Sequence, residues 1–118
     1  MTQTQRTTSF SRGDIVLVNF VFADETGIKT RPALVISSNT YHRGRQEVVL
    51  AAITSNTRRL LVGDTLLGAW REAGLLAPSV VTGVLRTVTQ SFLARRLGAI
   101  PASDLRGVEQ SLRLSLAL

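Results

Sequence analysis

The chain carries its apolar residues in short runs, which are separated by polar segments that contain glycine or proline. The three longest runs, at residues 14–20, 31–38 and 47–55, are rich in valine, leucine and isoleucine at successive positions. Such runs are apolar on both alternating faces, which is typical of strands buried in a sheet, whereas amphipathic helices space their apolar residues three and four apart. We therefore predict three strands, with the second and third at the centre of the sheet.

Weaker signals follow residue 55, where glycine and proline interrupt shorter apolar runs. They predict a broken fourth strand, a loop or single helical turn, and two short strands on either side of Gly83, at residues 60–67, 70–78, 79–82 and 84–88. Polar segments at residues 23–27 and 39–46 are predicted to be the loops that connect the first three strands.

The spacing of apolar residues changes after residue 89. Residues 90–97 predict a short helix that ends at Gly98. A second helix is predicted to open at Pro101, because apolar residues then recur at three- and four-residue spacing, as Leu105, Val108, Leu112 and Leu116. Five or six short strands followed by short C-terminal helices predict a small α+β fold with a strongly bent sheet that approaches a β-barrel. We expect a single domain at residues 12–118 and a flexible polar leader at residues 1–11.

The charge of the chain indicates the kind of partner to expect. The net charge is +6, and every basic residue except Lys29 is an arginine. Arginine pairs with phosphate through two hydrogen bonds and stacks on bases. This excess of positive charge therefore favours a polyanionic partner, and nucleic acid is the first candidate. A GC-rich genome that encodes arginine in place of lysine explains the ratio of the two residues, but it does not explain the excess of positive charge.

The composition excludes several classes of site. The chain has no cysteine, so disulfides and thiolate metal sites are excluded, and one histidine with eight scattered carboxylates does not favour a zinc site. No stretch reaches the ~18 apolar residues that cross a bilayer, and the first residues lack the apolar core of a signal peptide. We therefore expect a cytoplasmic protein with no metal, no cofactor and no membrane association.

Candidate chemistry is concentrated at the start of the second predicted strand. Arg31 precedes Pro32, which has no N–H for a ladder and belongs at a strand's first position or on an edge. Thr54 ends the next predicted strand, and antiparallel neighbours bring the start of one strand beside the end of the other. We therefore expect Arg31 and Thr54 to meet at one end of the sheet. A guanidinium beside a hydroxyl suits a phosphorane-like transition state, whose charge develops on non-bridging oxygens. The alternative is an arginine that only begins a strand in solvent.

Six segments, in their order along the chain, carry a resemblance to a known family: RGDIVLVNF, KTRPALVISS, VVLAAITSN, WREAGLLAPSVV, LRTV and ARRLGAI. They run from Arg12 to the C-terminal helix, and their order and spacing resemble the MazF/PemK family of toxin endoribonucleases. The resemblance implies an SH3-like barrel with added helices, a homodimer, and sequence-selective cleavage of single-stranded RNA without metal. It also implies an acidic antitoxin protein that blocks the RNA groove.

The resemblance also implies roles for two residues. Arg31 and Thr54 stand where similar members carry a catalytic arginine and a catalytic threonine. In the implied reaction the 2′-hydroxyl attacks the adjacent phosphorus and leaves a cyclic phosphate and a 5′-hydroxyl. Some members carry a further catalytic arginine and aspartate in the strand after the fourth segment, where this chain has Thr82, Gly83 and no carboxylate. The general acid and base are therefore unassigned, and an inactive member or a non-catalytic barrel that binds RNA or DNA remains an alternative.

Further side chains are candidate RNA contacts: Lys29, His42, Ser55, Asn56, Arg58 and Arg59. His42 is a proton carrier, an RNA contact or a surface loop residue, since imidazole titrates near neutral pH. Asp24 and Glu25 are either candidates for the catalytic base or solvated loop charges. Trp70 either stacks on a base or belongs to the core or a dimer interface.

Overall fold

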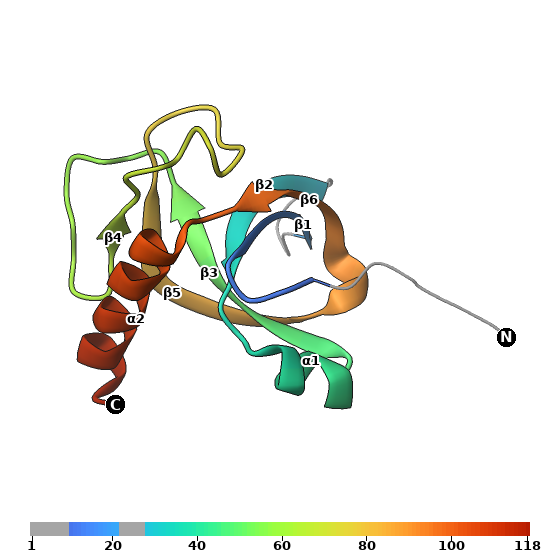
Figure 1. The fold of residues 1–118 in the computed structure, drawn as a ribbon. Helices are drawn as coiled ribbons and strands as arrows, with labels where there is room; N and C mark the ends of the chain where they lie inside the picture. The colour runs from blue at the N-terminus through green and yellow to red at the C-terminus, as the bar shows by residue number, and fades with distance from the viewer. Residues whose placement is uncertain (1–9, 22–27) are drawn as a thin grey trace, which may run out of the picture.

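The computed structural model describes residues 10–21 and 28–118. They form a six-stranded antiparallel sheet, hydrogen-bonded in the order β4-β5-β3-β2-β1-β6, and a C-terminal helix beside it (Figure 1). In chain order the elements are β1 (Asp14–Val21), β2 (Ile28–Val35), α1 (Asn39–Gly44), β3 (Glu47–Thr54), β4 (Thr65–Leu66), β5 (Val80–Thr89), the 3₁₀ turn η1 (Gln90–Phe92), β6 (Leu93–Ala99) and α2 (Ala102–Leu116). The predicted α+β class is confirmed, with six strands and with one C-terminal α-helix where two short helices were predicted.

The sheet buries apolar side chains on both of its faces. Along β3, Val48 and Leu50 belong to one core while Ala51 and Ile53 belong to the other, as the two-residue period of a strand requires. The outer core packs against α2 and consists of Ile15, Leu34, Ile36, Ala51, Ile53, Leu67, Ala73, Leu75, Val81, Ile100, Val108 and Leu112. The inner core lies within the curl of the sheet and consists of Val16, Val18, Ala33, Val35, Val48, Leu50 and Leu93. These two cores explain why the first three strands are apolar at nearly every position.

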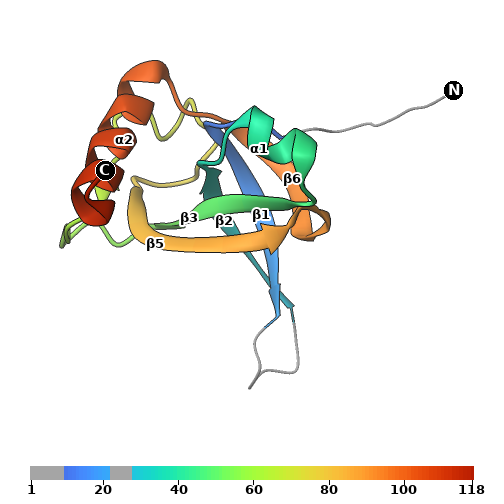
Figure 2. The same cartoon turned by 90° about the horizontal axis from the view of Figure 1, so that it is seen from below.

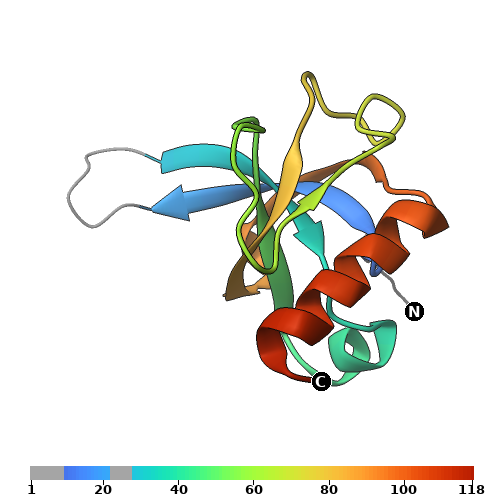
Figure 3. The same cartoon turned by 90° about the vertical axis from the view of Figure 1, so that its left-hand side faces the viewer.

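The sheet is curled, but it is not closed into a barrel. β4 and β6 are its two edges, and no ladder joins them within the described part of the chain. β3 and β5 lie side by side (Figure 2), and β1 has β6 on the side away from β2. The ends of β1 beyond Val18 and of β2 before Ala33 pair only with each other, so they extend as a two-stranded ribbon (Figure 3).

The helix predicted at residues 90–97 is wrong. This segment forms η1 and then β6, which pairs with β1 in antiparallel register. The side chain of Arg96 donates to Asp14 at 3.0 Å and joins β6 to the first residue of β1. Leu93 pairs with Val18 on β1 and is buried in the inner core. Pairing with the open edge of β1 therefore outweighs the local helical pattern, since strand formation depends strongly on tertiary context.

Gly98, which was predicted to end this helix, instead permits a close contact between two backbone segments. A Cβ on Gly98 would lie 2.5 Å from the carbonyl oxygen of Ala73, and a Cβ on Gly74 would lie 2.5 Å from that of Leu97. Gly74 also has a φ of +90°, which glycine adopts without steric penalty. The two glycines therefore let the turn around residue 73 pack directly on β6. This turn is the predicted single helical turn, because the N–H of Ala73 donates to the carbonyl of Ala69 at 3.1 Å.

Three other predicted elements differ in the structure. Part of the connector at residues 39–46 forms α1, with Ser38 as its N-cap. β5 runs through Gly83 as one continuous strand, because β3 and β4 pair with it on either side. Of residues 60–67, only Thr65–Leu66 form a strand. In α2 the predicted positions Val108 and Leu112 are buried.

Candidate active site

Arg31 on β2 and Thr54 at the end of β3 line the same cleft, as the sequence predicts. The β2–β3 ladder ends at the pair of Ala33 with Ala52, and continuing this register by two residues sets Arg31 opposite Thr54. The cleft has a volume of about 470 Å³. Its lining consists of Leu17, Arg31, Pro32, Ile53, Thr54, Ser55, Gly74, Leu75, Leu76, Ala77, Ser79 and Leu97. We call it the first cleft.

Pro32 lies where β2 separates from β3. The N–H of Ile36 donates to Val49 on β3 at 3.0 Å, and because backbone groups alternate sides along a strand, position 32 also faces β3. Pro32 has no N–H, and the β2–β3 ladder stops one residue short of it. The predicted edge position of Pro32 is therefore confirmed on the β3 side. It is not the first residue of its strand, because β2 continues back to Ile28 through pairing with β1.

The guanidinium of Arg31 is free to bind an anion. The residue is exposed, and its side chain makes no hydrogen bond or ion pair with the residues that the structure describes. Three other arginines do have carboxylate partners, in the pairs Arg12–Glu109, Arg45–Glu47 and Arg96–Asp14. In the first pair, the hydrogen bond and charge of Arg12 lower the pKa of Glu109. Arg31 therefore brings its positive charge and all five N–H donors into the first cleft.

The hydroxyl of Thr54 is oriented by the loop that follows it. The N–H of Asn56 donates to Thr54 Oγ1 at 3.1 Å, so the hydroxyl proton of Thr54 remains available for donation. The N–H of Arg58 in turn donates to Asn56 Oδ1 at 3.2 Å, which orders the start of this loop. The site therefore combines a free cation with a hydroxyl donor whose oxygen is already held in place.

Arg31 also borders a second cleft on the inner face of the sheet. This cleft has a volume of about 260 Å³ and is lined by Arg31, Pro32, Ala33, Leu50, Ala52, Ile53, Val84 and Arg86. Three residues line both clefts, namely Arg31, Pro32 and Ile53. Arg31 thus stands at the boundary between two openings, which lets a bound chain pass it on either side.

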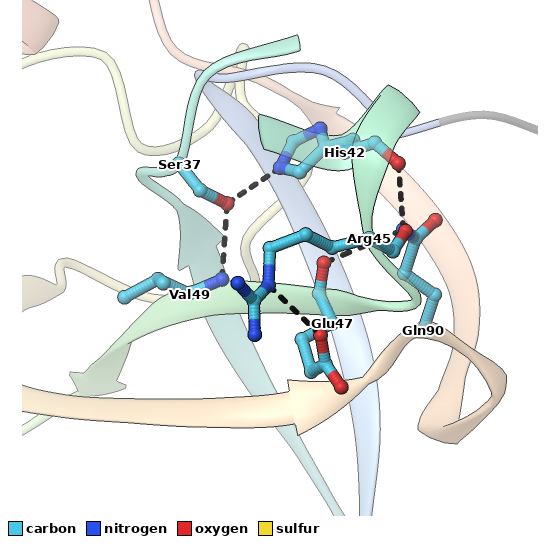
Figure 4. Close-up of polar contacts among 6 residues, drawn as sticks. All are labelled: Ser37, His42, Arg45, Glu47, Val49 and Gln90. Carbon is cyan, nitrogen blue, oxygen red and sulfur yellow. Dashed lines mark hydrogen bonds and ion pairs between the residues drawn. The ribbon is translucent and has the colours of Figure 1, made fainter. Parts of the chain in front are cut away.

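His42 is not brought to this site. It precedes β3, whereas Thr54 ends it, and eight residues at about 3.3 Å each separate the two ends of the strand by roughly 23 Å. His42 Nδ1 lies 3.0 Å from the carbonyl oxygen of Phe10. On the other side of the ring, His42 Nε2 lies 2.5 Å from Ser37 Oγ (Figure 4). Because a carbonyl only accepts, Nδ1 carries the proton and Ser37 donates to Nε2. Ser37 Oγ also accepts the N–H of Val49 at 2.9 Å, so this histidine is a half-buried link between α1 and the sheet.

The other predicted contacts lie around the first cleft or outside it. Lys29 shares a face of β2 with Arg31 by the two-residue period, and Ser55 lines the first cleft. Arg58 and Arg59 are exposed in the loop after Thr54, beyond the residues that line either cleft.

Some predicted roles change and others lie outside the described residues. Trp70 packs against the outer core, which favours the core interpretation. Asp24 and Glu25 lie outside the described residues. Arg86, which sequence reasoning did not select, lines the second cleft. Its position opposite Leu50 on β3 requires β5 to be one strand, and this was not predicted.

The described residues contain no group of three or more side chains suited to holding a metal ion. None of their helices is long and apolar enough to cross a membrane. Arg31 and Thr54 supply the first cleft with a guanidinium and a hydroxyl, two groups that stabilise negative charge on a phosphate.

Comparison with known proteins identifies the family. A model of the PemK-like, MazF-like toxin of type II toxin–antitoxin systems matches residues 11–116. Endoribonuclease MazF6 of Mycobacterium tuberculosis and endoribonuclease MazF2 of Mycobacterium bovis are both 39% identical over 93 residues, which span 76% of this chain and 81% of each relative.

Solved structures agree with this result. The Mycobacterium tuberculosis toxin MazF-mt6 is 25% identical with a TM-score of 0.72, over 89% of this chain and 97% of that chain. An endoribonuclease from a mycobacterial species, solved with its cognate antitoxin, has the same fold at 22% identity, with a TM-score of 0.74 over 93% of this chain and 97% of that chain. The chain belongs to the PemK-like, MazF-like toxin family of type II toxin–antitoxin systems.

Proposed function

We propose that this protein is the toxin of a type II toxin–antitoxin system and acts as a sequence-selective endoribonuclease on single-stranded RNA. The observation that carries the proposal is the guanidinium of Arg31, which has no ion-pair partner among the described residues, in one cleft with the oriented hydroxyl of Thr54. The relatives that are 39% identical are named endoribonucleases, which supports this activity. The net charge of +6 favours an RNA substrate.

In the proposed reaction a 2′-hydroxyl attacks the adjacent phosphorus. The new 2′-oxygen–phosphorus bond forms, the bond from phosphorus to the 5′-oxygen breaks, and the products are a cyclic phosphate and a 5′-hydroxyl. Arg31 stabilises the negative charge on the non-bridging oxygens, and Thr54 donates a hydrogen bond to one of them. The 2′-hydroxyl loses its proton and the leaving oxygen gains one. No resident metal is required by these steps.

The residues around the first cleft suit the flanking nucleotides. Lys29 extends the basic face of β2, and Ser55 and Asn56 present polar groups beside Thr54. Arg58 and Arg59 follow in the exposed loop, where they can pair with neighbouring phosphates. His42 lies at the other end of β3, so we assign it a structural role in place of the predicted RNA contact.

The proposal extends to assembly and location. We propose that an acidic antitoxin covers Arg31, because opposite charge steers such partners together, and that the toxin is a cytoplasmic homodimer. A mycobacterial endoribonuclease of the same fold was solved with its cognate antitoxin, which supports a partner of this kind. In this interpretation the curled sheet corresponds to the SH3-like barrel that the sequence resemblance implies.

One observation favours a second candidate, a non-catalytic nucleic-acid-binding protein. Neither cleft has a carboxylate or a histidine in its described lining, so no general base has been identified. The two candidates differ in a simple assay, in which labelled single-stranded RNA is incubated with the protein in excess EDTA. Cleaved RNA with a cyclic phosphate at its new 3′ end supports the nuclease. Retarded but intact RNA supports the binding protein.

Substitutions at the site complete this test. Arg31→Ala is expected to lower the cleavage rate by ~10²–10³, the usual loss for one preorganised donor at a developing oxyanion. Thr54→Val removes the hydroxyl and should cause a comparable loss, while Thr54→Ser keeps it and should retain most activity. Circular dichroism checks that each variant is folded. If folded Arg31→Ala and Thr54→Val cleave at the wild-type rate, the site is wrong, and a requirement for added Mg²⁺ would reject the mechanism.

A further inference from the structure

Leu76 is an exposed apolar side chain in the wall of the first cleft. It is 99% exposed, although the preceding residue, Leu75, is buried in the outer core. Of the large apolar side chains that are exposed in the described part of the chain, it alone lines the first cleft. Scattered exposed leucines are common on proteins and need no explanation. Leu76 differs from such residues because it lines the same cleft as Arg31 and Thr54.

The backbone on both sides of Leu76 is held in place. Before it, the N–H of Leu75 donates to the carbonyl of Trp70 at 3.1 Å, and Gly74 rests on β6. After it, Ser79 Oγ donates to the carbonyl of Ala77 at 2.8 Å, and the carbonyl of Ser79 accepts the N–H of Leu67 at 3.0 Å. Leu76 is therefore presented to solvent from a fixed turn, and its backbone loses little conformational freedom when a ligand covers it.

The two sides of the first cleft differ in chemistry. The ends of β2 and β3 contribute the cation of Arg31 and the hydroxyl of Thr54, whereas the turn after residue 73 contributes the apolar side chains of Leu75 and Leu76. A nucleotide has the same division, with an anionic phosphate and a planar base whose faces are apolar. A phosphate bound at Arg31 leaves the neighbouring base facing the leucines, where contact removes apolar surface from water.

We infer that Leu76 is a substrate-binding residue that packs against the base next to the scissile phosphate. This inference rests on the proposed function. The leucine side chain has no hydrogen-bonding group, so it contacts the base face without reading its edge. It favours a base at that position over an abasic site, and it leaves finer discrimination to polar groups elsewhere.

The contact is made equally in the ground state and the transition state, because the base does not react. Its loss should therefore raise KM and leave kcat unchanged, in contrast to the loss of Arg31. We expect Leu76→Ala to raise KM five- to tenfold, which corresponds to about 1–1.4 kcal/mol at about 1.4 kcal/mol per tenfold change. The fold should be unaffected, because the side chain is fully exposed.

The test uses short RNA substrates with one cleavage site, in which the nucleotide 5′ or 3′ to the scissile phosphate is replaced by an abasic ribonucleotide. KM and kcat are measured for the wild type, Leu76→Ala and Leu118→Ala. Leu118 is the matched control, because it is 84% exposed and lines neither cleft. For one of the two abasic positions, we expect the wild type to show the five- to tenfold rise in KM, and Leu76→Ala to show no additional rise over its value on intact RNA.

Two results would overturn the inference alone, and a third would overturn it together with the proposed function. Wild-type KM values for Leu76→Ala on every substrate would show that the leucine makes no contact, while the nuclease activity itself would stand. A fall in kcat without a change in KM would assign the residue to the chemical step and not to base contact. If the wild type does not cleave RNA at all, the proposed function fails, and the inference fails with it.

Discussion

Replacing Gly98 by alanine tests whether the turn around residue 73 is fixed to β6. The new Cβ would lie 2.5 Å from the carbonyl oxygen of Ala73 and 2.7 Å from its carbon. An ordinary carbon–oxygen contact is about 3.3 Å, so the turn has to move by about 0.8 Å. Both obstructing atoms belong to the backbone, so no side-chain rotation relieves the clash.

The expected size of the effect follows from two opposing terms. Overpacking typically costs about 1–3 kcal/mol. Alanine in place of glycine within a strand returns about 0.5–1 kcal/mol of conformational entropy. The midpoints of the two ranges give a net destabilisation of about 1.3 kcal/mol, which for a domain of this size lowers Tm by roughly 4–7 °C. The displaced turn also carries Leu75 and Leu76, so RNA cleavage by the folded variant should fall as well.

Thermal melting followed by circular dichroism measures this change, and Gly44→Ala is the matched control. A Cβ on Gly44 would meet nothing within 4 Å, and this residue ends α1 without a positive φ. The control should therefore melt at or slightly above the wild-type temperature, because alanine is the better helix former. If Gly98→Ala melts with the wild type, the turn moves freely, and the rigid wall on which Leu76 depends does not exist.

Two further substitutions test the structural roles assigned above. His42→Ala removes the partner of Ser37 Oγ and of the Phe10 carbonyl, so the free energy of unfolding in urea should fall by about 1–3 kcal/mol. The kcat of the folded variant should stay unchanged, whereas a loss of ~10² or more in kcat would make His42 a proton carrier. Asp104→Ala removes the acceptor of two N–H groups, from Gly68 at 3.1 Å and Ala69 at 3.0 Å, and should lower the free energy of unfolding by about 1–2 kcal/mol. Wild-type stability would rule out this link between α2 and the segment after β4.

The predicted strands were found where local sequence determines the outcome. The runs at residues 14–20, 31–38 and 47–55 are apolar on both faces, and the structure gives each face its own core. The meeting of Arg31 and Thr54 was also predictable, because an antiparallel pair joined by a short connector brings these ends together.

The errors occurred where tertiary contacts decide the conformation. β6 forms because β1 offers an unpaired edge and Arg96 meets Asp14, and neither fact is local to residues 90–97. α1 was missed because none of its residues is buried, so no apolar periodicity marks it, and Ser38 was the available signal. Leu76 and Arg86 were missed because their places in the clefts depend on how distant segments pack.

The position of Pro32 has a consequence for how RNA would meet this protein. An amide at this position would have a free N–H directed toward β3, and the ladder between the two strands would gain another rung. Such a rung would draw the strands together beside Arg31, where the first and second clefts now meet. The opening between the strands thus follows from the missing N–H of one residue and does not depend on the movement of a loop. A ligand arriving at Arg31 finds its entrance already formed, so binding spends no free energy on separating the strands.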